Sequence, residues 1–251
     1  MTTALSVNLN KIALLRNSRE GNSPDVIEFA KQSIDAGARG ITVHPRPDQR
    51  HIRPDDVYRL SDWLKGLPDN EFNIEGNPFA PSQGSYPGLM ALIEHTQPQQ
   101  ATLVPDSDDQ LTSDHGFDLR QESERLEPVI EQLKAWGIRI SLFMDPDIEQ
   151  IRLARVLGVD RIELYTGPYA AAYSTDQRHE SLATYQQAAL FAEEIGLTVN
   201  AGHDLNLYNL PDFLKIAPIA EVSIGHALTV DALQMGYKNA VSAYSKICQL
   251  V

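Results

Sequence analysis

Short runs of apolar and β-branched residues alternate along this chain with longer stretches in which apolar residues recur every three or four positions. The first pattern is typical of buried strands, and the second is typical of helices that pack one face against a sheet. The expected strands are residues 5–9, 40–43, 71–74, 101–104, 138–143, 161–165, 197–200 and 220–224. The clearest expected helices are residues 24–36, 54–65, 126–136, 146–157, 182–195 and 230–250.

Proline and glycine bracket several of the expected helices. Pro24, Pro54 and Pro146 stand where first helical turns are expected, and proline suits that position because its missing N–H would have no partner there. Four helices end at a glycine that leads directly into the next strand, namely Gly37, Gly137, Gly158 and Gly196. Glycine at a helix C-terminus permits the short turn that repeated strand–helix units require.

Eight strand–helix repeats in 251 residues predict an α/β fold, a single-domain (β/α)8 barrel over residues 1–251. A doubly wound open sheet is the alternative, but it normally has fewer strands and often carries a glycine-rich phosphate turn after the first one. Two stretches interrupt the repeat, residues 76–86 and residues 105–120, and each follows a strand. We expect both to be long loops at the mouth of the barrel.

The composition indicates a soluble, compact protein. Hydrophobic residues make up 42% and charged residues 22% of the chain, which are ordinary globular values. A formal net charge of −13 disfavours nucleic acid as a partner. No apolar run approaches the ~18 residues of a membrane span, and no export signal is visible. The single cysteine, Cys248, suits a reducing compartment, so we expect a cytoplasmic protein without a membrane partner.

Candidate chemistry gathers where the expected strands end, which is where the active sites of (β/α)8 barrels lie. These positions carry amides, histidines and carboxylates, namely Asn8, Asn10, His44, Glu75, Glu163, Asn200, His203 and His226. Burying an ionisable group costs several kcal/mol unless it has a charged or hydrogen-bonding partner, so such groups are usually kept because they serve a function. We therefore interpret them as the acid–base groups of one catalytic cavity.

Cationic side chains are concentrated in residues 44–53, although the chain as a whole is acidic. Guanidinium groups hold phosphate through forked, charge-assisted hydrogen bonds, so this segment predicts a phosphorylated small-molecule substrate. Arg46, two residues after a strand-end histidine, is the strongest candidate, whereas Arg50 and Arg53 could equally form surface ion pairs. Arg16 and Arg19 could add a second cationic wall or pair with a nearby glutamate.

A second phosphate site is expected at the ends of the last two strands. Gly202-His203 and Gly225-His226 both place a glycine before a histidine. Barrels often bind phosphate at these two positions through backbone N–H groups and a helix N-terminus. A metal centre is disfavoured because the histidines lack His-x-His or HExxH spacing and the neighbouring arginines would repel a cation.

Taken together, these segments resemble the pyridoxine 5'-phosphate synthase family. The resemblance is carried by ITVHPRPDQRHI at residues 41–52, NAGH at residues 200–203 and IGHA at residues 224–227. Shorter matches surround Asn8, Glu75 and Glu163, and the match is colinear over nearly the whole chain. The combination of motifs is much more specific than any one of them.

The resemblance implies a (β/α)8 enzyme of vitamin B6 biosynthesis. Such an enzyme forms pyridoxine 5'-phosphate from 1-deoxy-D-xylulose 5-phosphate and 3-amino-2-oxopropyl phosphate, with release of phosphate and water. The resemblance also implies that no metal or organic cofactor is needed, and that the chain assembles as a homo-oligomer, an octamer built from dimers.

The resemblance also implies roles for individual residues. His44 and Glu75 correspond to proton acceptors, and His203 corresponds to a proton donor. The expected contacts to the aminoketone phosphate are Asn8, Arg19, Gly225 and His226. The expected contacts to the deoxyxylulose phosphate are Arg46, His51 and Thr112, and Glu163 corresponds to a further active-site carboxylate.

Three positions depart from the family pattern. Asn10-Lys11 replaces the usual Asp-His, although Lys11 could still neutralise phosphate and Asn10 could still hydrogen-bond a hydroxyl. Asp204 replaces the usual glycine and would place a negative charge beside an anion site. Two alternatives therefore stay open: a catalytically weak relative that binds a phosphorylated metabolite, and a barrel enzyme that acts on a different amino or keto phosphate.

Overall fold

The computed structural model describes residues 2–107 and 109–250, so Asp108 of the expected loop at 105–120 lies outside the described residues. Eight parallel strands pair in chain order, and the first also pairs with the eighth, which closes a barrel. The strands are β1 (Ala4–Asn8), β2 (Gly40–Val43), β3 (Glu71–Gly76), β4 (Gln100–Leu103), β5 (Arg139–Met144), β6 (Arg161–Tyr165), β7 (Thr198–Gly202) and β8 (Glu221–Ile224). The predicted (β/α)8 barrel is confirmed, and all eight expected strands are present.

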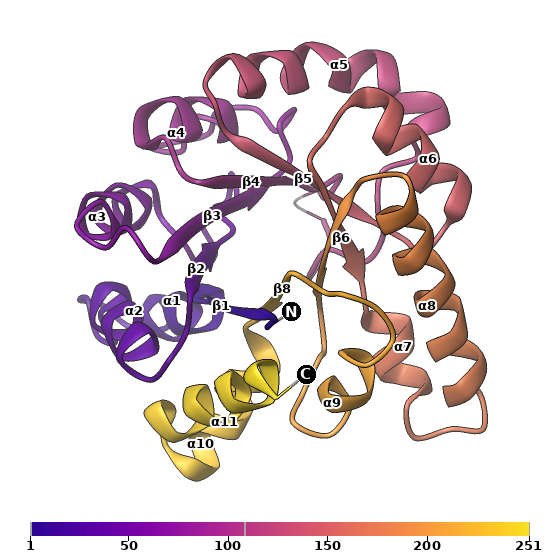
Figure 1. Cartoon of the computed structure of the whole chain (residues 1–251). Helices are drawn as coiled ribbons and strands as arrows, with labels where there is room; N and C mark the ends of the chain where they lie inside the picture. Colours follow the sequence, from indigo (N-terminus) through magenta and orange to yellow (C-terminus); the bar gives the residue numbers. More distant parts are fainter. Residues whose placement is uncertain (1, 108, 251) are drawn as a thin grey trace.

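Helices surround the barrel on the outside (Figure 1). They are α1 (Asn10–Asn17), α2 (Val26–Asp35), α3 (Pro54–Leu64), α4 (Leu89–Thr96), α5 (Leu119–Ala135), α6 (Ile148–Leu157), α7 (Gly167–Ala172), α8 (Arg178–Glu194), α9 (Leu210–Phe213), α10 (His226–Met235) and α11 (Tyr237–Gln249). Within the part of the chain that the structure describes, no helix is both long and apolar enough to cross a bilayer.

Some predicted helix ends are wrong. The single helix expected over residues 230–250 is divided at Gly236, whose φ of +83° does not fit a helix. Pro24 and Pro146 lie just before their helices, because the Asp25 and Asp147 side chains cap the first turns instead. Pro54 is in the first turn of α3, as expected.

The barrel interior carries a layer of hydrogen-bonded polar side chains. The Ser6 and Thr42 hydroxyls lie 2.7 Å apart, and Thr102 Oγ1 donates to Asn73 Oδ1 over 3.0 Å. These side chains are buried and come from neighbouring strands. Apolar residues between them, such as Ile41, face the surrounding helices and form the main core. The interior can therefore hold further polar side chains at the C-terminal ends of the strands.

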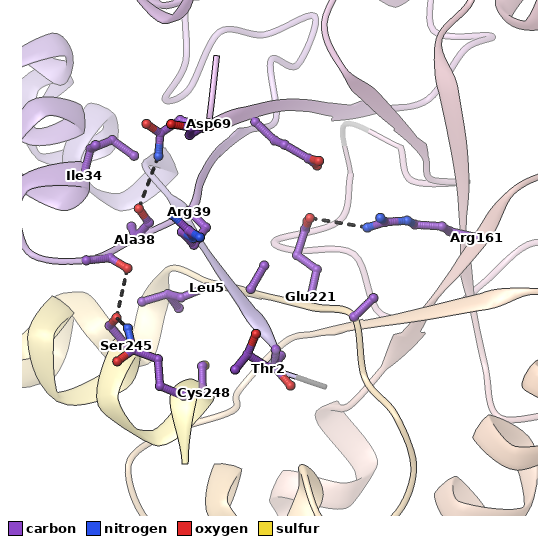
Figure 2. Close-up of a pocket in the computed structure, with 17 residues that line it drawn as sticks. Thr2, Leu5, Ile34, Ala38, Arg39, Asp69, Arg161, Glu221, Ser245 and Cys248 are labelled. Atoms are coloured by element: carbon purple, nitrogen blue, oxygen red, sulfur yellow. Dashed lines mark hydrogen bonds and ion pairs between the residues drawn. The ribbon is translucent and has the colours of Figure 1, made fainter. Parts of the chain in front are cut away.

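Charged side chains cross the N-terminal end of the barrel. Arg139 pairs with Glu71, and Arg161 Nη1 lies 3.6 Å from Glu221 Oε2. Figure 2 shows Arg161 and Glu221 pointing toward one another, and both line a hollow of about 800 Å³ at this end. Burial raises the pKa of Glu221 to about 7, although Arg161 opposes the shift. Active sites of such barrels lie at the opposite end, so we interpret this network as a structural one that closes the N-terminal end of the barrel.

Candidate active site

One cavity of about 350 Å³ opens at the C-terminal ends of the strands. It brings together thirteen of the residues that the sequence singled out, whereas Asn200, Arg16, Arg19 and Arg53 are not among the described residues that line it. The thirteen are Asn8, Asn10, Lys11, His44, Arg46, His51, Glu75, Thr112, Glu163, His203, Asp204, Gly225 and His226. Three strands, the loops after β2, β4, β7 and β8, and the first turns of α1 and α10 supply them, so the closed barrel makes them neighbours.

The first acid–base group is His44, which directly follows β2 and lies between two carboxylates. Its Nδ1 is 3.6 Å from Glu75 Oε2, and its Nε2 is 3.0 Å from Asp106 Oδ2. Burial disfavours the imidazolium, but the charges of Asp106 and Glu75 outweigh it and raise the pKa of His44 to about 9. His44 is therefore an imidazolium at neutral pH in this structure.

The pKa of the second histidine, His203, is shifted in the opposite direction to that of His44. His203 follows β7, and burial lowers its pKa, so its imidazole is neutral. The ring lies edge-on to Phe143 and Tyr165, with centroids 5.4 and 5.3 Å away, and its Nε2 is 2.9 Å from the Ser113 carbonyl oxygen. His203 and Asp204 both adopt positive φ, +82° and +57°. Such backbone strain in non-glycine residues is concentrated at functional sites.

Glu163 lies inside the barrel, in the middle of β6, and is almost completely buried. Its Oε2 contacts no hydrogen-bond partner in the described residues. Burial, and then the charges of Glu75 and Glu221, raise the pKa of Glu163 well above its usual value. A Cβ at Gly202 would lie 2.3 Å from Glu163 Oε1, so the glycine makes room for this carboxyl group. Burial therefore favours the neutral acid form of Glu163, and a protonated carboxyl group can donate a proton.

One wall of the cavity is cationic. The Arg46 guanidinium lies 2.5 Å from Asp106, and Lys11 lines the same wall with no ion-pair partner among the described residues. His51 Nδ1 accepts the backbone N–H of Ile52 at 2.9 Å, so its proton is on Nε2. Burial and the neighbouring cations lower the pKa of His51 to about 2. This wall can therefore bind phosphate with two cations and one neutral donor.

A second region suited to anions lies at the end of β8. Gly225 caps the N-terminus of α10, and His226 is the first residue of that helix. A Cβ at Gly225 would lie 3.0 Å from Asn8 Cβ and 3.1 Å from Asn8 O. The backbone therefore approaches Asn8 closely, and the helix N-terminus leaves N–H groups available to an anion.

The sequence suggested that Arg16 and Arg19 could form a second cationic wall, but neither lines the cavity within the described residues. Arg16 is 1% exposed and forms a buried ion pair with Asp56, while it also donates to the His51 carbonyl oxygen at 3.0 Å. Its role is structural. Arg19 is exposed, donates to the Ser18 carbonyl oxygen at 3.0 Å and does not line the cavity within the described residues.

Asp106 is the main residue that the sequence reasoning missed. It stands three residues after β4, and its side chain contacts both His44 and Arg46. The sequence shows it only as one of several acidic residues in a loop. A search for carboxylates just beyond every strand end would have found it. Among the described residues, no group of three or more histidine, cysteine or carboxylate side chains is arranged to hold a metal ion.

Comparison with known sequences identifies close relatives. Residues 5–250 match the family described as "Pyridoxal phosphate biosynthesis protein PdxJ". A curated protein named pyridoxine 5'-phosphate synthase from Xanthomonas campestris pv. campestris (strain B100) is 57% identical over 248 residues, which covers 98% of this chain and 96% of the relative. A protein of the same name from Xylella fastidiosa (strain M23) is 54% identical over 250 residues, which covers 99% of this chain and 96% of the relative.

Solved structures of low sequence identity share the fold. The Amycolatopsis orientalis BexX/CysO complex contains a chain with a TM-score of 0.64 at 15% identity, covering 98% of this chain and 88% of that one. N-(5'-phosphoribosyl)anthranilate isomerase from Pyrococcus furiosus has a TM-score of 0.58 at 13% identity, covering 99% of this chain and 100% of that one. At these identities the similarity shows the barrel fold alone.

Proposed function

The chain belongs to the PdxJ family of pyridoxal phosphate biosynthesis proteins, and we propose that it is a pyridoxine 5'-phosphate synthase. It condenses 1-deoxy-D-xylulose 5-phosphate with 3-amino-2-oxopropyl phosphate and releases phosphate and water. The observation that carries this proposal is the convergence of His44, Glu75 and His203 in one cavity that also has two regions suited to phosphate.

The reaction requires several proton transfers at different atoms. Joining an amine to a ketone expels water, and closing the ring and losing phosphate require further protons to be removed from carbon and delivered to departing oxygens. We assign Glu75 as the first proton acceptor. His44, as an imidazolium between Glu75 and Asp106, donates first and accepts a proton once it has done so. Glu163, a buried neutral acid, is a further donor.

The two phosphate groups are assigned to two different regions of the cavity. Arg46, Lys11 and His51 face the deoxyxylulose phosphate, and Thr112 lies on the loop beside them. Asn8, Gly225 and His226 face the aminoketone phosphate. His203 lies between Phe143, Tyr165 and the Ser113 carbonyl group, where it is held for proton donation to the joined intermediate.

We also propose a homo-oligomer, an octamer built from dimers, located in the cytoplasm. Family resemblance motivates the oligomer, and the single cysteine, which suits a reducing compartment, motivates the location. Exposed apolar side chains on two adjacent helices support the oligomer: Leu14 and Leu15 on α1, and Val230, Leu233 and Met235 on α10. Apolar patches of this kind often mark subunit interfaces.

Activity is tested by incubating the purified, metal-stripped protein with both substrates and following pyridoxine 5'-phosphate by mass and absorbance, together with phosphate release. Product without added metal supports the proposal. Absence of product while both phosphorylated ligands still bind would favour a weak binding relative or a different amino or keto phosphate substrate.

The Gly225→Ala variant is expected to raise the KM for the aminoketone phosphate about tenfold, equivalent to roughly 1.4 kcal/mol, with a smaller effect on the other substrate. The added methyl group would displace the turn that presents N–H groups, because it would crowd Asn8. Steady-state kinetics with each substrate varied in turn measure this effect. Gly66→Ala is the control, since its added Cβ would make only an ordinary 3.5 Å contact with Trp63 O. Equal KM changes for both substrates would contradict the site assignment.

Combining Asn10→Asp with Lys11→His is expected to change the KM for deoxyxylulose phosphate roughly threefold to tenfold, and the KM for the aminoketone phosphate less. Asn10 Oδ1 accepts the backbone N–H of His44 at 2.9 Å, and an aspartate can keep that bond. Lys11 lines the cavity, so its replacement alters the charge that faces phosphate. Steady-state kinetics with each substrate varied separately measure the two KM values. Equal changes in both would refute the placement of the deoxyxylulose phosphate beside Asn10 and Lys11.

A further inference from the structure

One oxygen of Asp106 joins three groups around the cavity. Asp106 Oδ2 lies 3.0 Å from His44 Nε2 and 2.5 Å from Arg46 Nη2, and it accepts a hydrogen bond from Ser113 Oγ at 3.3 Å. The Asp106 residue is 6% exposed, and its carbonyl oxygen accepts the Asn77 amide at 2.7 Å. Both its backbone and its carboxylate are therefore held in place.

Asp106 lies behind the cavity wall. His44 and Arg46 line both the 350 Å³ cavity and a smaller adjoining hollow of about 210 Å³, whereas Asp106 lines only the smaller one. The imidazole and the guanidinium therefore separate Asp106 from the space that substrates occupy. Any effect of Asp106 on the reaction must pass through His44 or Arg46.

The same carboxylate ties the loop after β4 to the loop after β2. Arg46, held by Asp106, donates to the Ser107 and Gln110 carbonyl oxygens, each at 3.1 Å. Ser113, further along the loop, donates to Asp106 and directs its own carbonyl oxygen at His203 Nε2. One buried negative charge thus organises the cationic wall and the loop that contacts the second histidine.

We propose that Asp106 is a positioning residue for the synthase reaction, which fixes the His44 imidazolium and the Arg46 guanidinium in their orientation toward the cavity. This inference rests on the proposed function. Asp106 takes no proton from substrate and touches no reacting atom. It holds His44 between two carboxylates, so that the edge carrying Nδ1 faces Glu75.

The groups that face His44 determine what happens when the charge of Asp106 is removed. Glu75 faces it from β3 and Asp106 from the loop after β4, while Arg46 on its own loop, the His51 ring 6.5 Å away, and His203 and Lys11 across the cavity complete its surroundings. Without Asp106, only Glu75 stabilises the positive charge, and burial and Arg46 oppose it. The pKa of His44 must then fall.

The experiment uses Asp106→Asn with Asp114→Asn as the matched control. Asp114 lies on the same loop, carries the same charge and pairs with a different histidine, His115. Histidine titration by NMR, with His44 assigned from the spectrum of a His44→Gln variant, gives each protein's pKa without any substrate. The titration can therefore be interpreted even if no pyridoxine 5'-phosphate is formed, so failure of this inference is distinguishable from failure of the proposed function.

We expect the His44 titration midpoint to move down from about 9 in the wild type by roughly 1–3 units in Asp106→Asn, and to be unchanged in Asp114→Asn. We also expect kcat to fall about 10²-fold in Asp106→Asn alone. Asp106→Glu should restore a raised midpoint and most of kcat, and it serves as the test if Asp106→Asn does not fold. An unchanged His44 midpoint in Asp106→Asn, an equal shift in Asp114→Asn, or a low midpoint in Asp106→Glu would overturn the proposal.

Discussion

Replacing Glu75 by glutamine is expected to lower kcat about 10³-fold while leaving the affinity for each phosphorylated substrate nearly unchanged. The amide has almost the same shape as the carboxylate but cannot accept a proton from carbon. Glu75 also lies 3.6 Å from His44 Nδ1 and accepts the Asn8 amide at 3.4 Å, so it is placed between the two substrate regions. The proposed phosphate contacts are made by other residues, and these remain.

Single-turnover formation of pyridoxine 5'-phosphate and calorimetric binding of each substrate measure the two halves of this prediction. Glu71→Gln is the matched control, because Glu71 lies on the same strand at the opposite end of the barrel. Its turnover should match the wild type. A Glu75→Gln variant that keeps wild-type turnover would remove Glu75 from the mechanism, and one that loses binding instead would make it a substrate ligand.

Replacing Glu163 by glutamine is expected to lower kcat about 10²-fold and, at pH 8, to raise the thermal unfolding temperature. The folded protein holds Glu163 protonated because burial raises its pKa, whereas the unfolded chain ionises at the ordinary value. Folding at high pH must therefore bind a proton, and the stability of the wild type falls as the pH rises above the usual glutamate pKa. Glutamine does not ionise, so the variant folds without taking up a proton at this position.

The stability gain of Glu163→Gln should consequently shrink as the pH is lowered from 8 toward 4.5, the unperturbed pKa of glutamate. Calorimetric unfolding across this range, alongside turnover, tests both effects. Glu149→Gln, on the exposed first turn of α6, is the control and should change neither. A gain that does not depend on pH would show that Glu163 is not held as a neutral acid, and full turnover would exclude it from catalysis.

The strands were predictable because their signal is local. Each is a short, mostly apolar run, and the barrel places the polar residues at the ends of β1, β2, β3, β6, β7 and β8 at one mouth. The same logic placed His44 and Glu75 in one cavity, although β3 continues past residue 74 to include Glu75 itself. The helix over Asn10–Asn17 was not predicted, because only Leu9 separates it from β1 and the hydrophobic pattern shows no break there.

The partners of charged side chains were not predictable in the same way. Arg16 and Arg19 are three residues apart in sequence, yet one forms a buried pair with Asp56 and the other lies in solvent. Asp106 looks like any acidic loop residue until the loop folds against His44 and Arg46. Protonation states depend on these contacts, so the sequence could name the histidines without assigning their charges.

The sequence by itself determined the barrel, the end of it that carries chemistry, and most of the residues that line the cavity. Periodicity, turn residues and motif spacing act over short distances, and the closed sheet converts them into a shared site. Only the tertiary structure decided that His44 is an imidazolium, that Glu163 is a neutral acid and that Asp106 links the two loops. Burial and long-range charge pairs set those properties, and both arise only when distant segments pack together.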